Sequence, residues 1–580
     1  MKLAEALKIS QTVPNASAEQ FHLYLACGIF PLHLSTFLAA HLRQRLPERA
    51  IEIRSGLYGD LPGNLVHLQQ SSVHAGAVVI EWSDLDPRLG LRRLGGWGPN
   101  VLPDVQANVQ RCTSQLLQLL AAAAQSTPLA VCLPTIQLPP ISYQPGEQFG
   151  LHGLLLEKML YDFAMSAAEI PHLKIVSRQR LDAISPFSER LDVKSELSTG
   201  FPYRTAHAAK VAELLAVLIQ PRPPKKGLIT DLDDTLWRGL LGEEGVEGIS
   251  WELDRHSHIH ALYQQLLLAL SESGALIGVA SKNDPALVTE ALARQDLLLP
   301  ADRLFPVEVN WSAKSQSVGQ VLEAWNIDAD AVVFVDDSPL ELAEVKSIYP
   351  AMECLRFPVD DEQSAYELLE RLRDLFAKQA ILEEDVIRVA SVRGGSQFHQ
   401  HAESESARPL QTFLEQVNAE LTLSSVPTAG EARAFELVNK TNQFNLNGRR
   451  LNDAEFQAAL NRPGAVSLLV SYSDKYGPLG KIAVLLGQVE SSALKIDTWV
   501  MSCRAFSRHI EHRCLEYLFE TLDVSEIELD FRPTARNGPV REFLSQFMDT
   551  EPTQSLRIQR EIFMSRKPAL SHKINEASYV

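Results

Sequence analysis

Two aspartates stand directly after a short apolar segment near the middle of the chain. The segment is GLIT (227–230), and Asp231 and Asp233 follow it. This order is expected where a buried parallel strand delivers catalytic groups at its carboxyl end. Two carboxylates there can bind a hard cation such as Mg²⁺, and one can attack phosphorus while the other moves a proton. The alternative is an acidic turn whose aspartates cap a helix.

Three later segments also bring polar side chains to the end of an apolar run or to the start of a helix. They are Ser281 and Lys282 after ALIGVA (275–280), Lys314 at the start of a predicted helix, and Asp336 and Asp337 after AVVFV (331–335). A serine and a lysine can hold phosphoryl oxygens and offset charge in a transition state, and an acidic pair can complete a metal site. Their order along the chain disfavours the simple capping turn.

The spacing Asp-x-Asp-x-Thr after a strand, followed by these segments, resembles the haloacid-dehalogenase (HAD) superfamily of phosphatases and phosphotransferases. The resemblance implies that Asp231 is the nucleophile, Asp233 the general acid and base, and Lys314 a further catalytic residue. It implies Mg²⁺ as the cofactor, held by Asp231, Asp233, Asp336 and Asp337. The expected substrate-binding residues of this region are Thr235, Arg238, Ser281 and Lys282.

Composition narrows the class of protein. The net charge of −18 argues against nonspecific nucleic-acid binding, which needs cationic contacts. The six cysteines show no CxxC or zinc spacing, which suits a reducing cytoplasm. We expect no signal peptide and, because no uninterrupted apolar run reaches about 18 residues, no membrane span. The expected localisation is cytoplasmic.

The first domain is expected over residues 1–222 as an α/β fold with a parallel sheet. Predicted strands and helices alternate; the strands are 21–27, 77–82 and 129–133, and the helices are 32–45, 106–124 and 205–219. The architecture resembles the SGNH hydrolases, but a clear Gly-Asp-Ser nucleophile block is missing. Cys27 stands at that place and is interpreted as a buried structural cysteine. We expect a degenerate or docking domain with a site near Cys27, Gly28 and Asp84.

A Pro-rich hinge, PRPPKK (221–226), precedes the HAD-like domain, which is expected over 223–378. Alternating strands and helices there predict a doubly wound parallel sheet. Only about 35 residues separate Asp233 from the end of the next helix, so no large cap domain is expected. A helical connector is predicted over 379–407.

The last domain, 408–580, is predicted to be a mixed α/β sheet. Its predicted strands are 419–426, 465–473, 480–488, 494–502 and 526–531, and its predicted helices are 429–439, 452–460, 508–522 and 539–547. The pattern resembles the GNAT acyltransferase fold. The segment RAFSRH (504–509) lacks the glycines that bind the pyrophosphate of acyl-CoA, so the usual acetyl-CoA binding is not expected.

Cys503 follows the predicted strand IDTWVMS and precedes a predicted long helix, between Arg504 and Arg508. A helix N-terminus and nearby cations lower the pKa of a thiol and raise its thiolate fraction. His509 and His512 could assist as bases. A packed, inert cysteine at the end of a strand is an equally open interpretation.

The combination of the HAD-like and GNAT-like halves closely resembles the FkbH-like family, which supplies glyceryl units to acyl carrier proteins. The stretches that carry the resemblance are DLDDTLWRGLLGEEG (231–245), ASKND (280–284), NWSAKS (310–315), VFVDDSPLE (333–341), LVNKTNQFN (437–445) and WVMSCRAFSR (499–508). The sequence departs from the family at Arg238, Glu244 and His509, and Arg238 could alter the choice of substrate.

The resemblance implies a bifunctional glyceryltransferase and phosphatase of polyketide biosynthesis. Cys503 would take a phosphoglyceryl group from 1,3-bisphosphoglycerate, the HAD-like site would remove the remaining phosphate, and glyceryl would pass to the phosphopantetheine thiol of a carrier protein. Arg504 and Arg508 are expected to bind substrate, together with the polar run Asn439, Lys440, Thr441, Asn442 and Gln443. For this run, capping of a helix end is the alternative.

Two other functions stay open. The first is a Mg²⁺-dependent phosphatase of a small phosphorylated metabolite whose C-terminal domain is only structural. The second is a non-enzymatic scaffold, which is disfavoured because keeping like charges buried together is costly without a function.

Overall fold

The computed structural model describes residues 1–10, 18–94, 96–141, 145, 147–148, 150–378, 381–394, 415–427, 431–490, 492–534, 536–548, 552 and 554–577. The chain divides into two compact units, Met1–Arg222 and Pro223–Val580. The second unit holds two sheets. Within the described residues, no helix combines the length and the apolar character that a membrane crossing requires.

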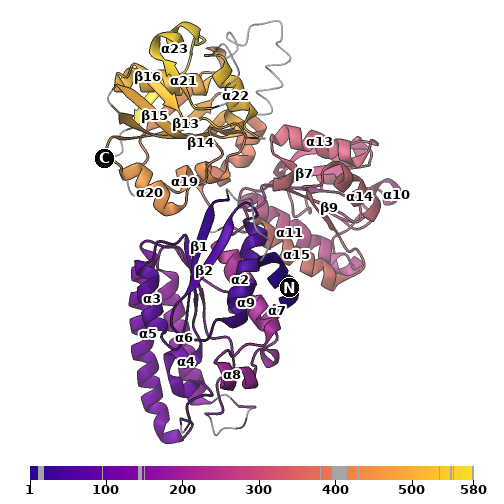
Figure 1. Ribbon diagram of the computed structural model, residues 1–580. Helices are drawn as coiled ribbons and strands as arrows, with labels where there is room; N and C mark the ends of the chain where they lie inside the picture. Colours follow the sequence, from indigo (N-terminus) through magenta and orange to yellow (C-terminus); the bar gives the residue numbers. More distant parts are fainter. Residues whose placement is uncertain are drawn as a thin grey trace. The chain divides into compact units, whose positions relative to one another are not determined.

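The first unit is built on a five-stranded parallel sheet of order β2-β1-β3-β4-β5. The strands are β1 (Gln20–Cys27), β2 (Ala50–Ser55), β3 (Ala75–Val79), β4 (Leu129–Cys132) and β5 (Leu173–Ile175). One apolar core packs α1 (Leu3–Ser10), α2 (Leu32–Arg45) and α9 (Thr205–Ile219) on one face. A second core packs α3 (Leu61–Gln70), α5 (Leu102–Ala124) and α6 (Leu151–Ala168) on the other face, as Figure 1 shows.

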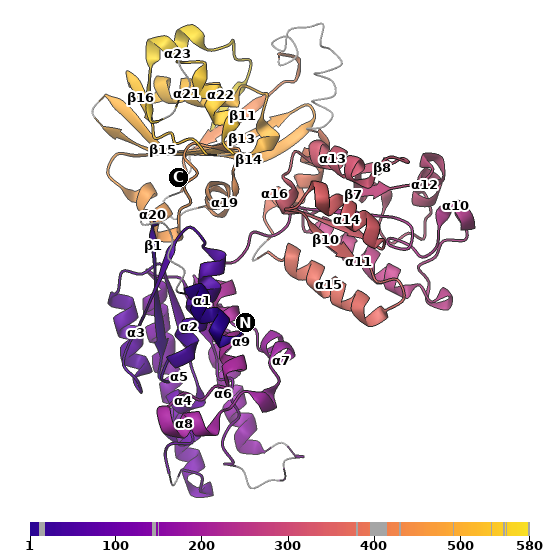
Figure 2. The same ribbon diagram turned by 45° about the vertical axis from the view of Figure 1, so that its right-hand side comes forward.

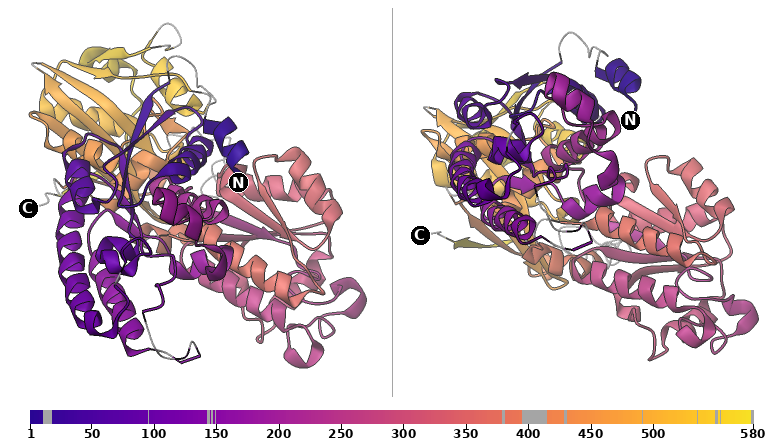
Figure 3. Two further views of the ribbon diagram at one scale, coloured as in Figure 1. Left: turned by 60° about the horizontal axis from the view of Figure 1, so that its bottom comes forward. Right: turned by 90° about the horizontal axis from the view of Figure 1, so that it is seen from below.

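The second unit begins with another five-stranded parallel sheet, of order β10-β9-β6-β7-β8. Its strands are β6 (Gly227–Thr230), β7 (Leu276–Ser281), β8 (Leu304–Val309), β9 (Val332–Asp336) and β10 (Glu353–Arg356). They lie side by side between helices in Figure 3. The helices include α11 (His258–Glu272), α12 (Pro285–Leu292), α13 (Lys314–Trp325), α14 (Pro339–Ile348) and α15 (Glu362–Phe376).

No large cap interrupts this fold between β6 and β7. The intervening segment holds only the short α10 (Leu241–Glu244), one turn of 3₁₀ helix and α11, and each of its residues is described. About half of the predicted connector 379–407 is described, namely residues 381–394, and that part is helical over α16 (Glu383–Val386) and over 388–394.

The rest of the unit carries a mixed sheet of order β17-β16-β15-β14-β13-β11-β18, and β12 pairs with β15. The strands are β11 (Glu420–Ser424), β12 (Phe444–Asn445), β13 (Ala465–Asp474), β14 (Gly477–Glu490), β15 (Ala493–Met501), β16 (Glu526–Leu529), β17 (Leu556–Gln559) and β18 (Lys573–Ala577). The pairs β15–β16 and β11–β18 are parallel and the others antiparallel.

Helices cover both faces of the mixed sheet (Figure 2). The helices α21 (Ile510–Leu522), α22 (Gly538–Ser545) and α23 (Arg560–Arg566) pack on one face, and α19 (Ala432–Lys440) and α20 (Asp453–Asn461) on the other. The predicted α/β class, with two parallel sheets and a mixed third sheet, is therefore confirmed.

Candidate functional site

The acidic residues of the central parallel sheet meet at its carboxyl edge. Asp231 follows β6 directly, and Asp336 is the last residue of β9. The two strands are neighbours in parallel register, with Thr230 opposite Val335. Because parallel strands end at the same edge, the two carboxylates are brought together by the fold itself.

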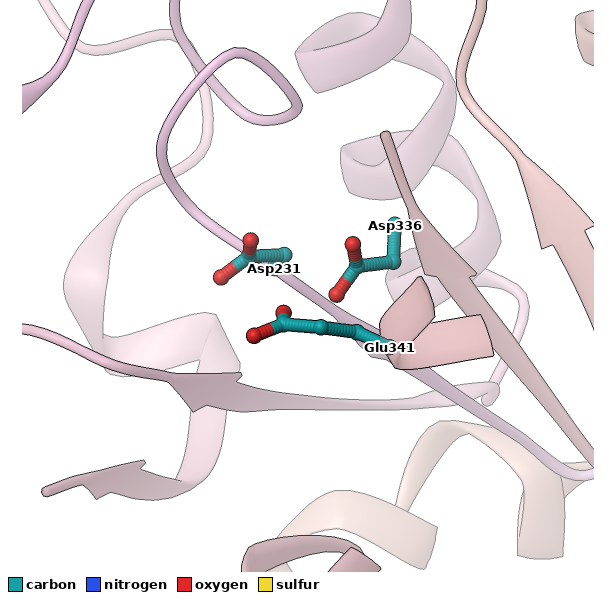
Figure 4. Close-up of side chains that lie close together, drawn as sticks. All are labelled: Asp231, Asp336 and Glu341. Atoms are coloured by element: carbon teal, nitrogen blue, oxygen red, sulfur yellow. The ribbon is translucent and has the colours of Figure 1, made fainter. Parts of the chain in front are cut away.

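Lys314 joins this edge from the first position of α13 and is 2% exposed. Its Nζ lies 2.9 Å from Asp231 Oδ1 and 3.0 Å from Asp336 Oδ2. A third carboxylate, Glu341, contacts it at 2.7 Å through Oε2. The three carboxylates therefore surround one buried ammonium group, and Figure 4 shows them side by side.

Glu341 is a site residue that the sequence analysis did not include. It lies in the first turn of α14, where the N-cap Ser338 accepts a hydrogen bond from its backbone N–H at 3.5 Å. Its second oxygen, Oε1, pairs with Lys282 Nζ at 2.9 Å. Glu341 thus holds the two lysines Lys282 and Lys314 at one point.

Asp233 is fixed by donors from three directions. Its Oδ1 accepts from Trp237 Nε1 at 3.0 Å and from the Leu241 N–H at 3.3 Å, and its Oδ2 accepts from Asn283 Nδ2 at 3.0 Å. Burial raises the pKa of Asp233 despite these donors, and the nearby charge of Asp231 adds to the rise. A carboxyl group with a raised pKa is suited to donate and then accept a proton.

Like charge is concentrated at this edge. Burial, with the Asp231 charge adding to it, raises the pKa of Asp336 to about 7, and burial raises that of Asp337 to about 6. Carboxylate oxygens of Asp231, Asp336 and Glu341 all lie within 4.8 Å of one another. Clustered carboxylates are the donors that a hard divalent cation prefers, so the donor set fits Mg²⁺.

The other residues predicted to bind phosphate, Ser281, Thr235 and Arg238, differ from one another in burial and in contacts. Ser281 ends β7 and is buried. Thr235 is fully buried, and its hydroxyl makes no hydrogen bond within the described residues. Arg238 Nη1 lies 3.2 Å from both the Val359 carbonyl oxygen and Asp360 Oδ1, a surface contact.

Cys503 lies in a second region of the same unit, just after β15. Its Sγ donates to the Asn326 carbonyl oxygen at 3.1 Å, and Asn326 Nδ2 donates to the Cys503 carbonyl oxygen at 3.3 Å. The residue lines two cavities of about 90 and 100 Å³. Lys226, Ile327, Lys440, Thr441 and Ser502 line both of them.

The predicted polar run is divided by the fold. Lys440 and Thr441 line both cavities, and Asn442 and Gln443 line the second. Asn439 does not line either cavity. Its Nδ2 donates to the Phe435 carbonyl oxygen and its Oδ1 accepts from the Leu451 N–H, both at 3.1 Å, so it ties helix α19 to the following loop.

The expected helix N-terminus at Cys503 is not observed. The chain forms one 3₁₀ turn, Cys503–Ala505, and α21 begins only at Ile510, after His509 in the left-handed region with φ 55°. The predicted helix 508–522 is observed as α21, which begins two residues later than predicted. Cys503 therefore does not belong to the first turn of α21, where the helix dipole is strongest.

Two basic residues that were expected to assist Cys503, Arg508 and His512, are buried in contacts with other residues. Arg508 is 1% exposed, pairs with Asp474 at 3.4 Å and stacks over Tyr472. His512 is buried, and its Nε2 contacts Gln546 Oε1 at 2.9 Å. Neither residue lines the two cavities. The side chain of Arg504 lies outside the described part of the structure.

Among the described residues of the first unit, no comparable group of carboxylates gathers at the predicted site. Asn64 Nδ2 donates to the Cys27 carbonyl oxygen at 2.8 Å, and a Cβ on Gly28 would lie 1.8 Å from Asp84 Oδ1. The predicted strand ends therefore do meet. Burial raises the pKa of Cys27 to about 12, which makes its thiol a poor nucleophile.

Comparison with known proteins adds evidence on the fold. No family model matches the chain, and no curated protein matches it. A solved structure that matches is the N-terminal part of the protein BF1531 from Bacteroides fragilis, which contains a phosphatase domain and is complexed with Mg. The match has 18% identity and a TM-score of 0.51, and covers 66% of this chain and 100% of that one. At this identity the likeness shows the shared fold.

Proposed function

We propose that this chain is a bifunctional enzyme. Its HAD-like half hydrolyses a phosphate monoester with Mg²⁺, and its GNAT-like half carries an acyl group on Cys503. The acyl group is the glyceryl unit of 1,3-bisphosphoglycerate, and an acyl carrier protein receives it. The observation that carries the enzymatic assignment is Lys314, buried among the carboxylates of Asp231, Asp336 and Glu341 at the carboxyl edge of a parallel sheet.

Such a cluster is costly to keep for stability alone, because removing charges from water is only partly compensated by their pairing. Open α/β sheets bind their ligands at the carboxyl ends of the strands, and this cluster lies there. The BF1531 structure of the same fold is described as containing a phosphatase domain and is complexed with Mg, which supports the same chemistry here.

The residues present have defined roles in monoester hydrolysis. The carboxylate of Asp231 attacks phosphorus, the bond from phosphorus to the ester oxygen breaks, and Asp233 gives that oxygen its proton. A water molecule then attacks the phosphorylated Asp231, and Asp233 takes the proton back while inorganic phosphate leaves. Lys314 stabilises negative charge on the phosphoryl oxygens.

Mg²⁺ would be held by Asp231, Asp336 and the backbone carbonyl of Asp233, and would offset the charge of the phosphoryl group. Asp337 stays a proposed ligand as well. Burial raises the pKa of Asp337 to about 6, with the charges of Asp231 and Asp234 adding to the rise, so its carboxyl group lies in the same field of negative charge as Asp231.

The acyl half rests on the surroundings of Cys503. Its thiol lines cavities together with Thr441, Asn442 and Gln443, whose side chains can bind hydroxyl groups or a thioester oxygen. In the proposed step the sulfur attacks the acyl carbon of an acyl phosphate. The carbon–oxygen bond to phosphate breaks, and the thiol proton leaves on the released phosphate.

The second candidate is a plain phosphatase of a small metabolite. Hydrolysis of p-nitrophenyl phosphate tests what the two candidates share. Asp231→Asn should lower kcat by about 10³-fold or more. The control Asp302→Asn, an exposed substitution in the same domain, should keep the wild-type kcat. Full activity in Asp231→Asn would overturn both. Covalent acylation of Cys503 separates them, since only the bifunctional enzyme needs it.

A further inference from the structure

The cavity beside Cys503 is strongly cationic in a chain of net charge −18. The first cavity is lined by four cationic side chains and one anionic side chain, namely Lys226, Arg388, Arg433, Lys440 and Glu436. None of these cations belongs to the phosphate-monoester site at the carboxyl edge. The acidic surface thus contains a local site with the opposite charge.

The carboxylates nearby do not neutralise this cluster. Glu436 lies between Arg433 and Lys440, with contacts of 2.5 and 2.8 Å, and those two cations hold its pKa at about 2 despite burial. Asp385 pairs with Arg388 but also with Lys378. Glu436 and Asp385 thus contact three of the four cations that line the cavity, and neither contacts the fourth, Lys226, within the described residues.

Two groups retain unused capacity toward an anion. Within the described residues, the Nζ of Lys226 has no ion pair or hydrogen bond, although the side chain lines both cavities. Arg433 is 7% exposed, and its Nε is buried without a hydrogen-bond partner in that same part of the chain. A buried donor without a partner is costly, and an anion bound in the cavity that Arg433 lines would offset that cost.

We propose that this cavity is a phosphate-binding subsite for the acyl donor of Cys503. The inference rests on the proposed function and extends it, because it assigns residues on both sides of the cavity to donor selection. The cavity of about 90 Å³ has room for several groups of the size of water, which is the scale of a phosphate group. Its contribution would be to hold a phosphate group while the thiol attacks the acyl carbon.

The phosphate can come from either end of the donor. It can be the acyl phosphate that leaves, or the monoester that stays on the acyl group. Both offer the same dianionic oxygens to Lys226 and Arg433, and compounds that carry only one of the two groups distinguish them. Inorganic phosphate is the leaving group itself, and 3-phosphoglycerate carries only the monoester.

The test is the alkylation rate of individual cysteines, measured by peptide mass spectrometry on the full chain. Iodoacetate is anionic and iodoacetamide is neutral. Cys112 and Cys354 are half-buried as Cys503 is, so they serve as references in the same sample. The iodoacetate-to-iodoacetamide ratio at Cys503 should exceed theirs about tenfold, the lower end of electrostatic focusing in charged clefts.

Lys226→Met and Arg433→Gln should each lower that ratio severalfold, and Lys495→Met, an exposed change on β15, should leave it unchanged. Inorganic phosphate and 3-phosphoglycerate should protect Cys503 in the wild type and not in Lys226→Met. Protection by 3-phosphoglycerate well beyond that by inorganic phosphate assigns the subsite to the retained monoester; otherwise it serves the leaving group.

Equal ratios at Cys503 and the reference cysteines would overturn the inference, and so would an anion preference without protection by phosphate. The proposed function fails separately. If phosphate protects Cys503 but acyl phosphates never acylate it, the subsite stands and the acyl-transfer proposal falls. If acyl phosphates acylate Cys503 but phosphate does not protect it, the acyl-transfer proposal stands and the subsite falls.

Discussion

Lys314 and Cys503 lie at opposite ends of helix α13. Lys314 is the first residue of the helix and contacts Asp231, and Asn326, its C-cap, exchanges two hydrogen bonds with Cys503. A helix of 12 residues is about 18 Å long. The thiol and the phosphate-monoester site are therefore well separated within one unit.

This separation bears on the order of the reaction steps. A phosphoglyceryl group on Cys503 extends over about five bonds of roughly 1.5 Å, which is less than half of that distance. Its phosphate cannot reach Asp231 while the acyl group stays on the thiol. We therefore expect the acyl group to move to the arm of the carrier protein first, and the phosphate to be removed afterwards. The sequence alone suggested the opposite order.

Glu341→Gln should lower kcat for p-nitrophenyl phosphate by about 10- to 100-fold, the usual effect of losing a group that orients the residues of a metal site. The reason is that Glu341 holds both Lys314 and Lys282. Steady-state kinetics measures the change. Glu344→Gln, on the same helix, is the control because Glu344 accepts from the Ser315 backbone N–H at 2.9 Å and, within the described residues, forms no ion pair with the ammonium groups of Lys314 and Lys282. Equal kinetics for the two variants would contradict the role given to Glu341.

Lys314→Met should destabilise the cation-free protein by about 3–5 kcal/mol, because it leaves buried carboxylates without their ammonium partner. Adding Mg²⁺ should raise the Tm of this variant more than that of the wild type, since a cation then offsets the same charges. Differential scanning calorimetry with and without Mg²⁺ measures both effects. Lys346→Met, which loses only a contact to the Met352 carbonyl oxygen, is the control. A Tm of Lys314→Met that does not respond to Mg²⁺ would argue against a cation site here.

Asp84 should make the stability of the first unit depend on pH. Burial raises its pKa to about 7, with the charges of Glu81 and Glu196 adding to the rise. Because the folded state holds this proton more tightly than the unfolded state, stability should fall as pH rises from about 4, the unfolded pKa, to about 7. Above that pH range the stabilisation that comes from the Asp84 proton is fully lost.

Asp84→Asn removes the titrating group, so the Tm of the variant relative to the wild type should increase across the same pH range. Asp162→Asn, an exposed change in an i,i+4 pair, should show no such trend. Thermal unfolding followed at pH 4.5, 6 and 7.5 gives the comparison. Parallel curves for Asp84→Asn and the wild type would refute the assignment.

The central site could be predicted largely from sequence because its residues follow buried strands. Apolar runs located β6, β7 and β9, and parallel pairing then required Asp231 and Asp336 to meet. Glu341 was missed because it follows the strand by five residues. A signal was present, since Ser338 and Glu341 have the spacing of a helix N-cap and its N3 glutamate. That signal would have placed Glu341 at the start of α14, beside the strand end.

Edge strands and tertiary contacts could not be predicted in the same way. The strand β2 is only half-buried, so its residues Ala50–Ser55 lack a continuous apolar run. The cavity beside Cys503 joins Lys226, Arg388 and Arg433, which are far apart in the sequence. Its charge depends on how the two sheets of the second unit pack, and a local pattern does not encode that packing.

The intact mass of the purified chain, with Mg²⁺ and 1,3-bisphosphoglycerate generated in situ, tests the central claim most directly. Without a carrier protein we predict a phosphoglyceryl adduct on the wild type and none on Cys503→Ala. With a pantetheinylated carrier, a glyceryl group without phosphate should appear on the carrier. An adduct on Cys503→Ala, or no adduct on the wild type while simple phosphate esters are hydrolysed, would contradict the account.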